Sequence, residues 1–235
     1  MREGEPLIEW EWIARNTDQI IARLVQHVGL TLIAVVFGLA ISFVLALIVY
    51  RRRSLYPPLA GFAATLYTIP SIALFAILTP ITGFGSIVTA EIALVSYTLL
   101  ILLRNIVAGL DSVPADVREA ATAMGYSPWQ QLWRVELPLA LPLIIAGVRV
   151  ATVTTVGLVT VAAVIGQGGL GQLILTGLRT FFATPIYVGA FLSLALALVA
   201  DVALVQLQRA LTPWALRRTH DYAADALAAA PGASL

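Results

Sequence analysis

The chain has 235 residues, of which 60% are hydrophobic and only 11% charged, and its formal net charge is +1. Soluble domains carry about 25% charged residues, so this composition excludes a soluble enzyme and a disordered chain. All 14 basic residues are arginine and there is no cysteine, which excludes a phosphate-loop ATPase, a Schiff-base enzyme and a thiolate metal site. The small net charge gives no reason to expect nucleic acid as a partner. We therefore expect a membrane protein without a cofactor and without catalytic chemistry of its own.

Five apolar segments are long enough to cross a bilayer, which takes about 20 residues for about 30 Å of hydrocarbon. The first follows 27 polar-rich residues and ends at three consecutive arginines, so it is predicted to be a retained helix and not a signal peptide. The sequence thus predicts an all-α, polytopic membrane protein with five transmembrane helices, over residues 28–50, 58–80, 87–103, 139–165 and 186–207.

The arginines predict the orientation in the membrane. Ten of the 14 fall on the side that follows spans one, three and five, and basic residues gather on the cytoplasmic side. We expect a multi-pass protein of the cell (inner) membrane with its N-terminus outside and its C-terminus in the cytoplasm. Residues 1–27 would be an extracytoplasmic segment with an interfacial amphipathic helix. Residues 28–213 would form the transmembrane domain, and residues 214–235 a cytoplasmic tail that frays.

The longest polar segment between spans, residues 105–139, is expected to form a compact two-helix loop. Its first helix is predicted over Pro114–Met124, with Gly125 in the left-handed conformation that ends helices. Its second helix starts at Ser127, which forms a capping box with Gln130, and is expected to end before Leu137. The residues alone leave open whether this is an ordinary charged loop or a docking element.

The spacing of certain residues in this loop resembles the EAA loop of ATP-binding-cassette importer permeases. The pattern is EAA, three residues, Gly, nine residues and then Ile-x-Leu-Pro, with Val135 in place of isoleucine here. The resemblance implies a type I importer permease fold whose loop docks on a separate ATPase subunit. It implies two ATPase copies, a second permease copy or paralogue, an extracytoplasmic solute-binding protein and surrounding membrane lipid as partners. The coupling residues would be Glu119, Ala120, Ala121, Gly125, Trp129, Leu137 and Pro138.

Further stretches are similar to the permeases of osmoprotectant importers, which carry glycine betaine, choline or carnitine. They include residues 69–75 (IPSIALF), residues 99–105 (LLILLRN) and residues 165–171 (IGQGGLG). Methionine-importer permeases share the glycine-rich run, so an amino-acid importer is the alternative. A membrane adaptor that docks an ATPase without transporting a solute is a third possibility.

Two local features would line the translocation path. Pro70 removes a backbone hydrogen bond and bends its helix, either as a packed kink or as a bend beside the path. The glycines after span four release the chain from helical geometry, either in an ordinary outer loop or in a gate. The residues predicted for path and gate are Pro70, Ser71, Tyr97, Gly166, Gly168, Gly169 and Gly171.

Charged residues within spans are costly and often functional. Glu91 either reaches headgroup water or attracts a cationic solute. Asp201 is expected to pair with Arg149 or Arg209, and His27 is expected at the membrane interface.

Overall fold

The computed structural model describes residues 7–214, and every regular element in that range is helical. Three short turns complete the helices: 3-10 turns at Arg53–Leu55 and Ala162–Ile165, and a π-helix at Leu132–Glu136. The α-helices are α1 (Trp10–Arg15), α2 (Thr17–Arg51), α3 (Tyr56–Thr68), α4 (Ser71–Thr82), α5 (Ile87–Asp111), α6 (Ala115–Ala123), α7 (Pro128–Gln131), α8 (Leu137–Val161), α9 (Gly171–Thr180) and α10 (Ala183–Leu211).

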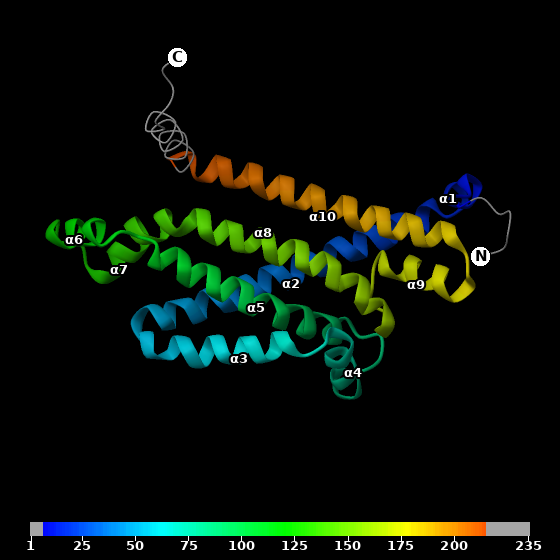
Figure 1. Ribbon diagram of the computed structural model, residues 1–235, viewed down its shortest axis with the longest axis horizontal. Helices are drawn as coiled ribbons and strands as arrows, with labels where there is room; N and C mark the ends of the chain where they lie inside the picture. The colour runs from blue at the N-terminus through cyan, green and yellow to red at the C-terminus, as the bar shows by residue number, and fades with distance from the viewer. Residues whose placement is uncertain (1–6, 215–235) are drawn as a thin grey trace, which may run out of the picture.

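The long helices lie side by side along one axis, with α10 on one side of the bundle and α3 on the other (Figure 1). Helices α6 and α7 project at one end, which we call the loop end. Helices α1 and α9 lie at the opposite end (Figure 1), which we call the glycine end because it carries residues 166–171.

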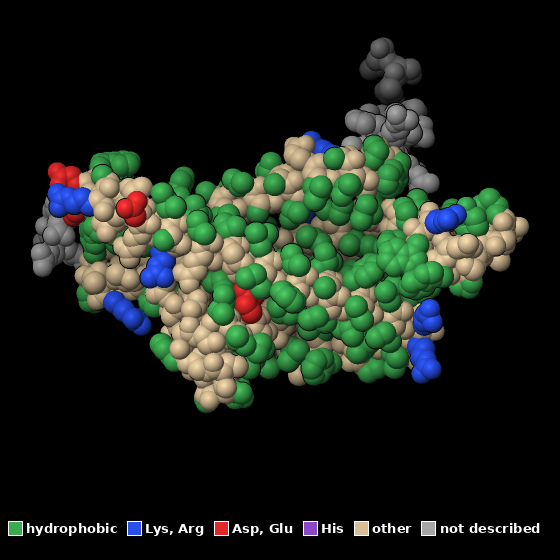
Figure 2. Space-filling model, turned by 180° about the vertical axis from the view of Figure 1, so that it is seen from behind, with side chains coloured by type: hydrophobic (Ala, Val, Ile, Leu, Met, Phe, Trp, Pro, Cys, Tyr) green, Lys and Arg blue, Asp and Glu red, His purple; other side chains and the backbone are tan. Residues whose placement is uncertain are grey.

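Four helical segments are long and apolar enough to cross a membrane: α2, α5, α10 and the continuous stretch Pro128–Ile165. Helices α3 and α4 pass the same test only as a bent pair, which would make a fifth. The outer surface agrees with this, because hydrophobic side chains cover much of the middle of the molecule and most visible charges lie toward its ends (Figure 2).

The second predicted span is broken. The axis turns by 94° between Arg53–Thr68 and Ser71–Thr82, so residues 58–80 are not one straight helix but bend at Pro70, where the sequence predicts a bend. Pro70 disfavours the helical conformation of the residue before it, and Ile69 and Pro70 are extended, with ψ of 126° and 133°. Helix α3 has 13 residues, which reach about 20 Å at 1.5 Å per residue.

The predicted boundary at residue 28 does not interrupt the first helix. Helix α2 has 35 residues and starts at Thr17, so the expected interfacial helix is the beginning of span one. Its first part packs on α9 and α10, where Ile20 contacts a cluster with Leu170 and Leu173. The N-terminal residues 1–6 and the predicted tail, apart from Trp214, lie outside the described residues.

The polar loop is also shorter than predicted. Helix α5 continues to Asp111, and the second loop helix does not end before Leu137 but runs through the π-turn into α8. Pro138 has no N–H to donate to the carbonyl of Arg134. The wider π-turn that directly precedes α8 lets the helix continue past this proline. The second helix of the loop is therefore continuous with span four.

The core lies around α5, which packs against both α2 and α8. Half of the apolar window of α5 is buried, whereas only 11% of that of α10 is. Glycines allow α2 and α8 to approach α5 closely. A Cβ on Gly38 of α2 would lie 1.8 Å from Thr98 Oγ1, and one on Gly147 of α8 would lie 2.4 Å from Asn105 Cβ. Helix α10 is thus the most exposed of the long helices that the structure describes.

Candidate functional site

The knob at the loop end, which we define as residues 112–131, is a compact unit with satisfied helix ends. Helix α6 ends in a Schellman motif, in which the N–H of Tyr126 donates to the carbonyl of Ala121 and that of Gly125 to Thr122. Gly125 has φ of 81°, as predicted. The capping box between Ser127 and Gln130 is present in both directions.

The predicted coupling residues fall into two groups. Glu119, Ala120 and Gly125 are exposed on the knob, and a Cβ added at Gly125 would contact nothing within 4 Å. Close packing therefore does not explain this glycine, whereas its backbone conformation does. Ala121 is buried, and Leu137 and Pro138 are half-buried in the first turn of α8.

The two tryptophans of the knob region contact helix α2. Trp129 and Trp133 meet edge to face at 5.6 Å between ring centroids, and Trp133 lies 5.9 Å from Phe43. The Arg51 guanidinium lies 5.5 Å from the Trp129 ring centroid, in cation–π geometry. Trp129 is 47% exposed, so one part of its surface holds the knob against α2 and the rest remains available to a partner.

A buried carboxylate that the sequence patterns did not single out fastens the knob to the bundle. Glu136 is 1% exposed and accepts hydrogen bonds from the Tyr50 hydroxyl at 3.0 Å and the Gln131 amide at 2.9 Å. Arg118 of α6 lies 3.6 Å away and also donates to the carbonyl of Leu110 at 2.6 Å. One side chain in the π-turn before α8 thereby contacts α2, α6 and α7. The only signal of this role in the sequence is an acidic residue directly before the apolar residues of span four.

Tight packing accounts for three of the four predicted glycines at the glycine end. A Cβ would lie 2.4 Å from Ala163 Cα at Gly168, 2.6 Å from His27 Cβ at Gly169, and 2.2 Å from the carbonyl oxygen of Thr160 at Gly171. Gly166 instead ends the preceding 3-10 turn with φ of 87°.

Side chains from distant segments hold the glycine-rich segment in place. His27 is fully buried between helices and does not lie on the surface of the bundle. Its Nε2 lies 3.0 Å from the carbonyl of Val156, and its Nδ1 accepts from the N–H of Leu170 at 3.3 Å. Gln167 accepts from Gln26 at 2.9 Å and donates to the carbonyl of Gly85 at 2.6 Å.

The bend at Pro70 lies close to this segment. The Tyr97 hydroxyl donates to the carbonyl of Ile69, whose helix ends there, and Ser71 begins α4. Tyr97, residues of α4 and residues 162–165 share one buried cluster. The structure thus brings together the predicted path residues from spans two and three and the start of the glycine-rich segment.

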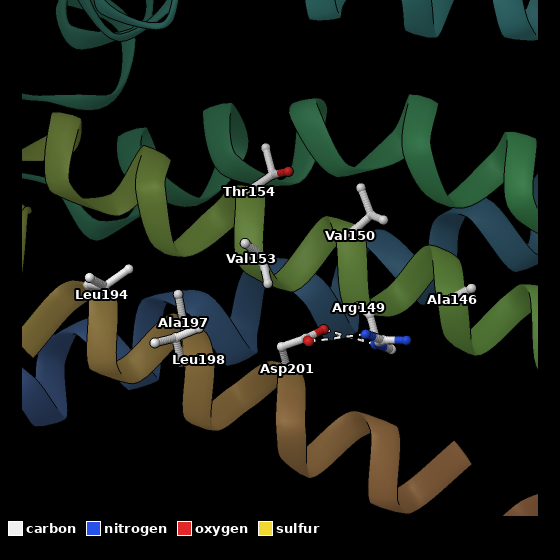
Figure 3. A pocket seen from close by; sticks show the side chains of 9 residues that line it. All are labelled: Ala146, Arg149, Val150, Val153, Thr154, Leu194, Ala197, Leu198 and Asp201. Atoms are coloured by element: carbon white, nitrogen blue, oxygen red, sulfur yellow. Dashed lines mark hydrogen bonds and ion pairs between the residues drawn. The ribbon is translucent and has the colours of Figure 1, made fainter. Parts of the chain in front are cut away.

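An ion pair lies within the apolar part of the bundle. Arg149 of α8 donates from Nε and Nη2 to the two carboxylate oxygens of Asp201 of α10, at 2.8 and 3.0 Å (Figure 3). This confirms the first of the two partners expected for Asp201. Glu91 differs, because both of its carboxylate oxygens are shielded and have no hydrogen-bond partner among the described residues.

The ion pair borders an open hollow of about 520 Å³ between α8 and α10. Small-molecule sites in proteins typically measure about 300–1,000 Å³. Within residues 7–214 no group of three or more acids, histidines or cysteines could hold a metal ion. The remaining lining residues are Ala146, Val150, Val153, Thr154, Leu194, Ala197 and Leu198 (Figure 3).

A bundle of long apolar helices with a capped polar knob at one end is the architecture of a polytopic membrane protein. The family model that matches residues 20–213 is the binding-protein-dependent transport system inner membrane component. The chain belongs to this family.

Relatives and solved structures agree with this assignment. The chain is 39% identical over 206 residues to the osmoprotectant import permease protein OsmW of Salmonella typhimurium, covering 86% of this chain and 96% of the relative. It is 34% identical to the choline transport system permease protein OpuBB of Bacillus subtilis, covering 88% and 95%. Its fold is similar to a chain of the inward-facing MetNI methionine ABC transporter, with a TM-score of 0.75, 24% identity and coverage of 83% and 97%. The methionine transporter thus supports the fold, while the relatives of higher identity favour the osmoprotectant reading.

Proposed function

We propose that this chain forms the translocation path of an ATP-binding-cassette importer for quaternary-amine osmoprotectants, such as glycine betaine, carnitine or choline. The observation that carries the proposal is the knob, whose EAA spacing coincides with an exposed, doubly capped unit joined to span four. The similarity to permeases named for osmoprotectants and choline supports the solute class.

The family implies an ATPase, a solute-binding protein and a further permease as partners. Glu119, Ala120 and Gly125 would contact the ATPase directly, with Trp129 at the margin. Ala121, Leu137 and Pro138 would shape the knob from within. We place two ATPase copies at the loop end and the binding protein at the glycine end, with the second permease an identical copy or a paralogue.

ATP hydrolysis belongs to the partner in this proposal. The chain has no lysine at all, whereas a phosphate loop uses one at the β- and γ-phosphates. The chain's own contribution would be to bind, shape and move the path. Pro70, Ser71 and Tyr97 would form a bend beside it, and the glycine-rich segment 166–171 would form a gate at the outer end.

Uptake by reconstituted vesicles tests the proposal. The chain is assembled with its ATPase and binding protein in proteoliposomes, and labelled glycine betaine, carnitine and choline are supplied with methionine as competitor. ATP-driven uptake of a quaternary amine that methionine does not reduce is expected. ATP-driven methionine uptake would favour the amino-acid importer, and docking of the ATPase without any uptake would favour an adaptor.

The proposed orientation has a direct test because the chain has no cysteine. Ala123→Cys on the knob and Phe181→Cys at the glycine end both place a thiol at exposed positions. In intact cells a membrane-impermeant maleimide should label the second variant and not the first. Labelling of Ala123→Cys alone would reverse the orientation and reject the knob as a cytoplasmic docking element.

A further inference from the structure

The ion pair between Arg149 of α8 and Asp201 of α10 lies far from either end of the bundle, and Arg149 is at the middle of its helix. Arg149 follows the first residue of α8 by 12 positions, which corresponds to about 18 Å along the axis. The two side chains remain 31% and 34% exposed, and both line the hollow between α8 and α10 (Figure 3).

A partly exposed ion pair in the middle of an apolar helix is unfavourable in contact with lipid tails. Charged side chains in membrane segments face the protein interior or a water-filled cavity, and they commonly mark solute pathways. The hollow therefore has to be covered by protein or filled with water when the chain is in a membrane. Since α10 is largely exposed, the hollow between α8 and α10 is accessible to a solute from the surface of the bundle.

The hollow combines two opposite charges with an apolar wall. Val150, Val153 and Leu198 offer methyl groups, Thr154 adds a hydroxyl, and the ion pair lies at one edge. A zwitterion with a quaternary ammonium and a carboxylate has the matching pattern: a bulky methylated cation beside a planar anion. Guanidinium groups bind carboxylates with bidentate geometry, so such a solute could replace each partner of the pair by its own charge.

We propose that this hollow is a binding site for zwitterionic quaternary amines, in which Asp201 receives the ammonium and Arg149 the carboxylate. The proposal deepens the function proposed above and rests on it for the solute class. In the absence of solute the two side chains bind each other, and the site is closed. A bound solute separates the two side chains and opens the site.

The site predicts a preference that a structural ion pair would not produce. Glycine betaine and carnitine carry a carboxylate and can satisfy both side chains. Choline has no carboxylate, so it would leave the Arg149 charge without an anionic partner whenever Asp201 binds the ammonium. The chain should therefore bind glycine betaine more tightly than choline.

Equilibrium binding is the direct test. The purified chain, assembled with its ATPase in lipid nanodiscs and without the binding protein, is titrated with labelled glycine betaine and with choline as competitor. Arg149→Gln should weaken glycine betaine binding at least about tenfold, the factor expected for one charge-assisted hydrogen bond. The same change should leave choline binding equal or tighter, because it removes a repulsive charge and frees Asp201.

A double variant separates binding from packing. Arg149→Met combined with Asp201→Leu replaces the ion pair by apolar side chains, a change that often leaves stability unaltered. It should assemble with the ATPase yet lose glycine betaine binding. The matched control is Glu11→Gln with Arg15→Gln, which removes an exposed ion pair on α1 and should leave binding unchanged.

The outcomes are distinct. Absence of saturable binding by the unchanged chain, normal binding by the double apolar variant, or equal weakening of glycine betaine and choline by Arg149→Gln would each overturn the site. Binding with the expected pattern but without ATP-driven uptake of any quaternary amine would support the site and reject the proposed transport function.

Discussion

Removing the Glu136 side chain should release the knob from the bundle without unfolding the spans. In Glu136→Ala the Tyr50 hydroxyl and the Gln131 amide both lose their acceptor. Both donors are half-buried and can turn to water, so we count only the net worth of each hydrogen bond, about 0.5–1.5 kcal/mol, or about 1–3 kcal/mol for the two. Arg118 is 36% exposed and 3.6 Å distant, and we assign its contact no further energy because solvent screens such pairs.

Hydrogen exchange measures this loss locally. The amides of α6 and α7 should exchange about 5- to 140-fold faster in Glu136→Ala, since each 1.4 kcal/mol is a factor of ten. Amides in the middle of α5 should keep their protection. Tyr50→Phe removes one of the two donors and should produce a smaller effect in the same segment.

A matched control uses an exposed acid of the knob. Glu119 lies exposed on the same knob, and Glu119→Gln should leave the exchange of α6 and α7 unchanged. In proteoliposomes Glu136→Ala should retain ATP hydrolysis but consume more ATP per solute imported. Unchanged protection of the knob in Glu136→Ala would refute the reasoning, because the buried carboxylate would then not hold it.

Three further substitutions, the first with a control, test the packing of the glycine end and the bend. Gly171→Ala should lower the melting temperature in detergent, because its Cβ would lie 2.2 Å from a backbone oxygen. The control is Gly157→Ala, whose Cβ would have nothing within 4 Å. It should be neutral or stabilising by about 1 kcal/mol. His27→Phe should cost about 1–3 kcal/mol in thermal or denaturant unfolding, since it removes the acceptor of the buried Leu170 N–H; an unchanged midpoint would contradict the observed contact. Tyr97→Phe should cost about 1 kcal/mol, because it removes the hydrogen bond to the carbonyl of Ile69 and so loosens the bend. The distribution of distances between spin labels on α3 and α4 should become broader than in the unchanged chain. Identical distributions in the two proteins would contradict this expectation.

Local backbone rules predicted the polar loop well where the determinants are close in sequence. The capping box at Ser127 and the left-handed Gly125 depend on residues within one or two helical turns. The same rules were wrong at Pro138, where a π-turn lets the helix continue. That outcome depends on packing around the turn, including the contacts of Glu136, which lie beyond the local sequence.

Long-range contacts decided the features that the sequence could not predict. His27 reads as an interfacial residue from its position before an apolar run, but Val156 and Leu170 bury it. The glycines at 168, 169 and 171 were attributed to backbone freedom, whereas the structure shows that neighbouring backbone occupies the space of their side chains. Proline at position 70 predicted a bend, and only the fold shows that it turns the chain by 94°.

One continuous helical stretch connects the features to which we assign function. Residues Pro128–Ile165 run without a break from the knob to the start of the glycine-rich segment, a length of about 57 Å. Glu136 lies near one end, Arg149 near the middle, and Val156, the partner of His27, toward the other. A tilt of the knob would therefore move the ion pair and the glycine end together, because one helical stretch carries all three. We infer that movement of this helix relative to α10 would open or close the contact between Arg149 and Asp201, because that contact joins the two helices within the hollow.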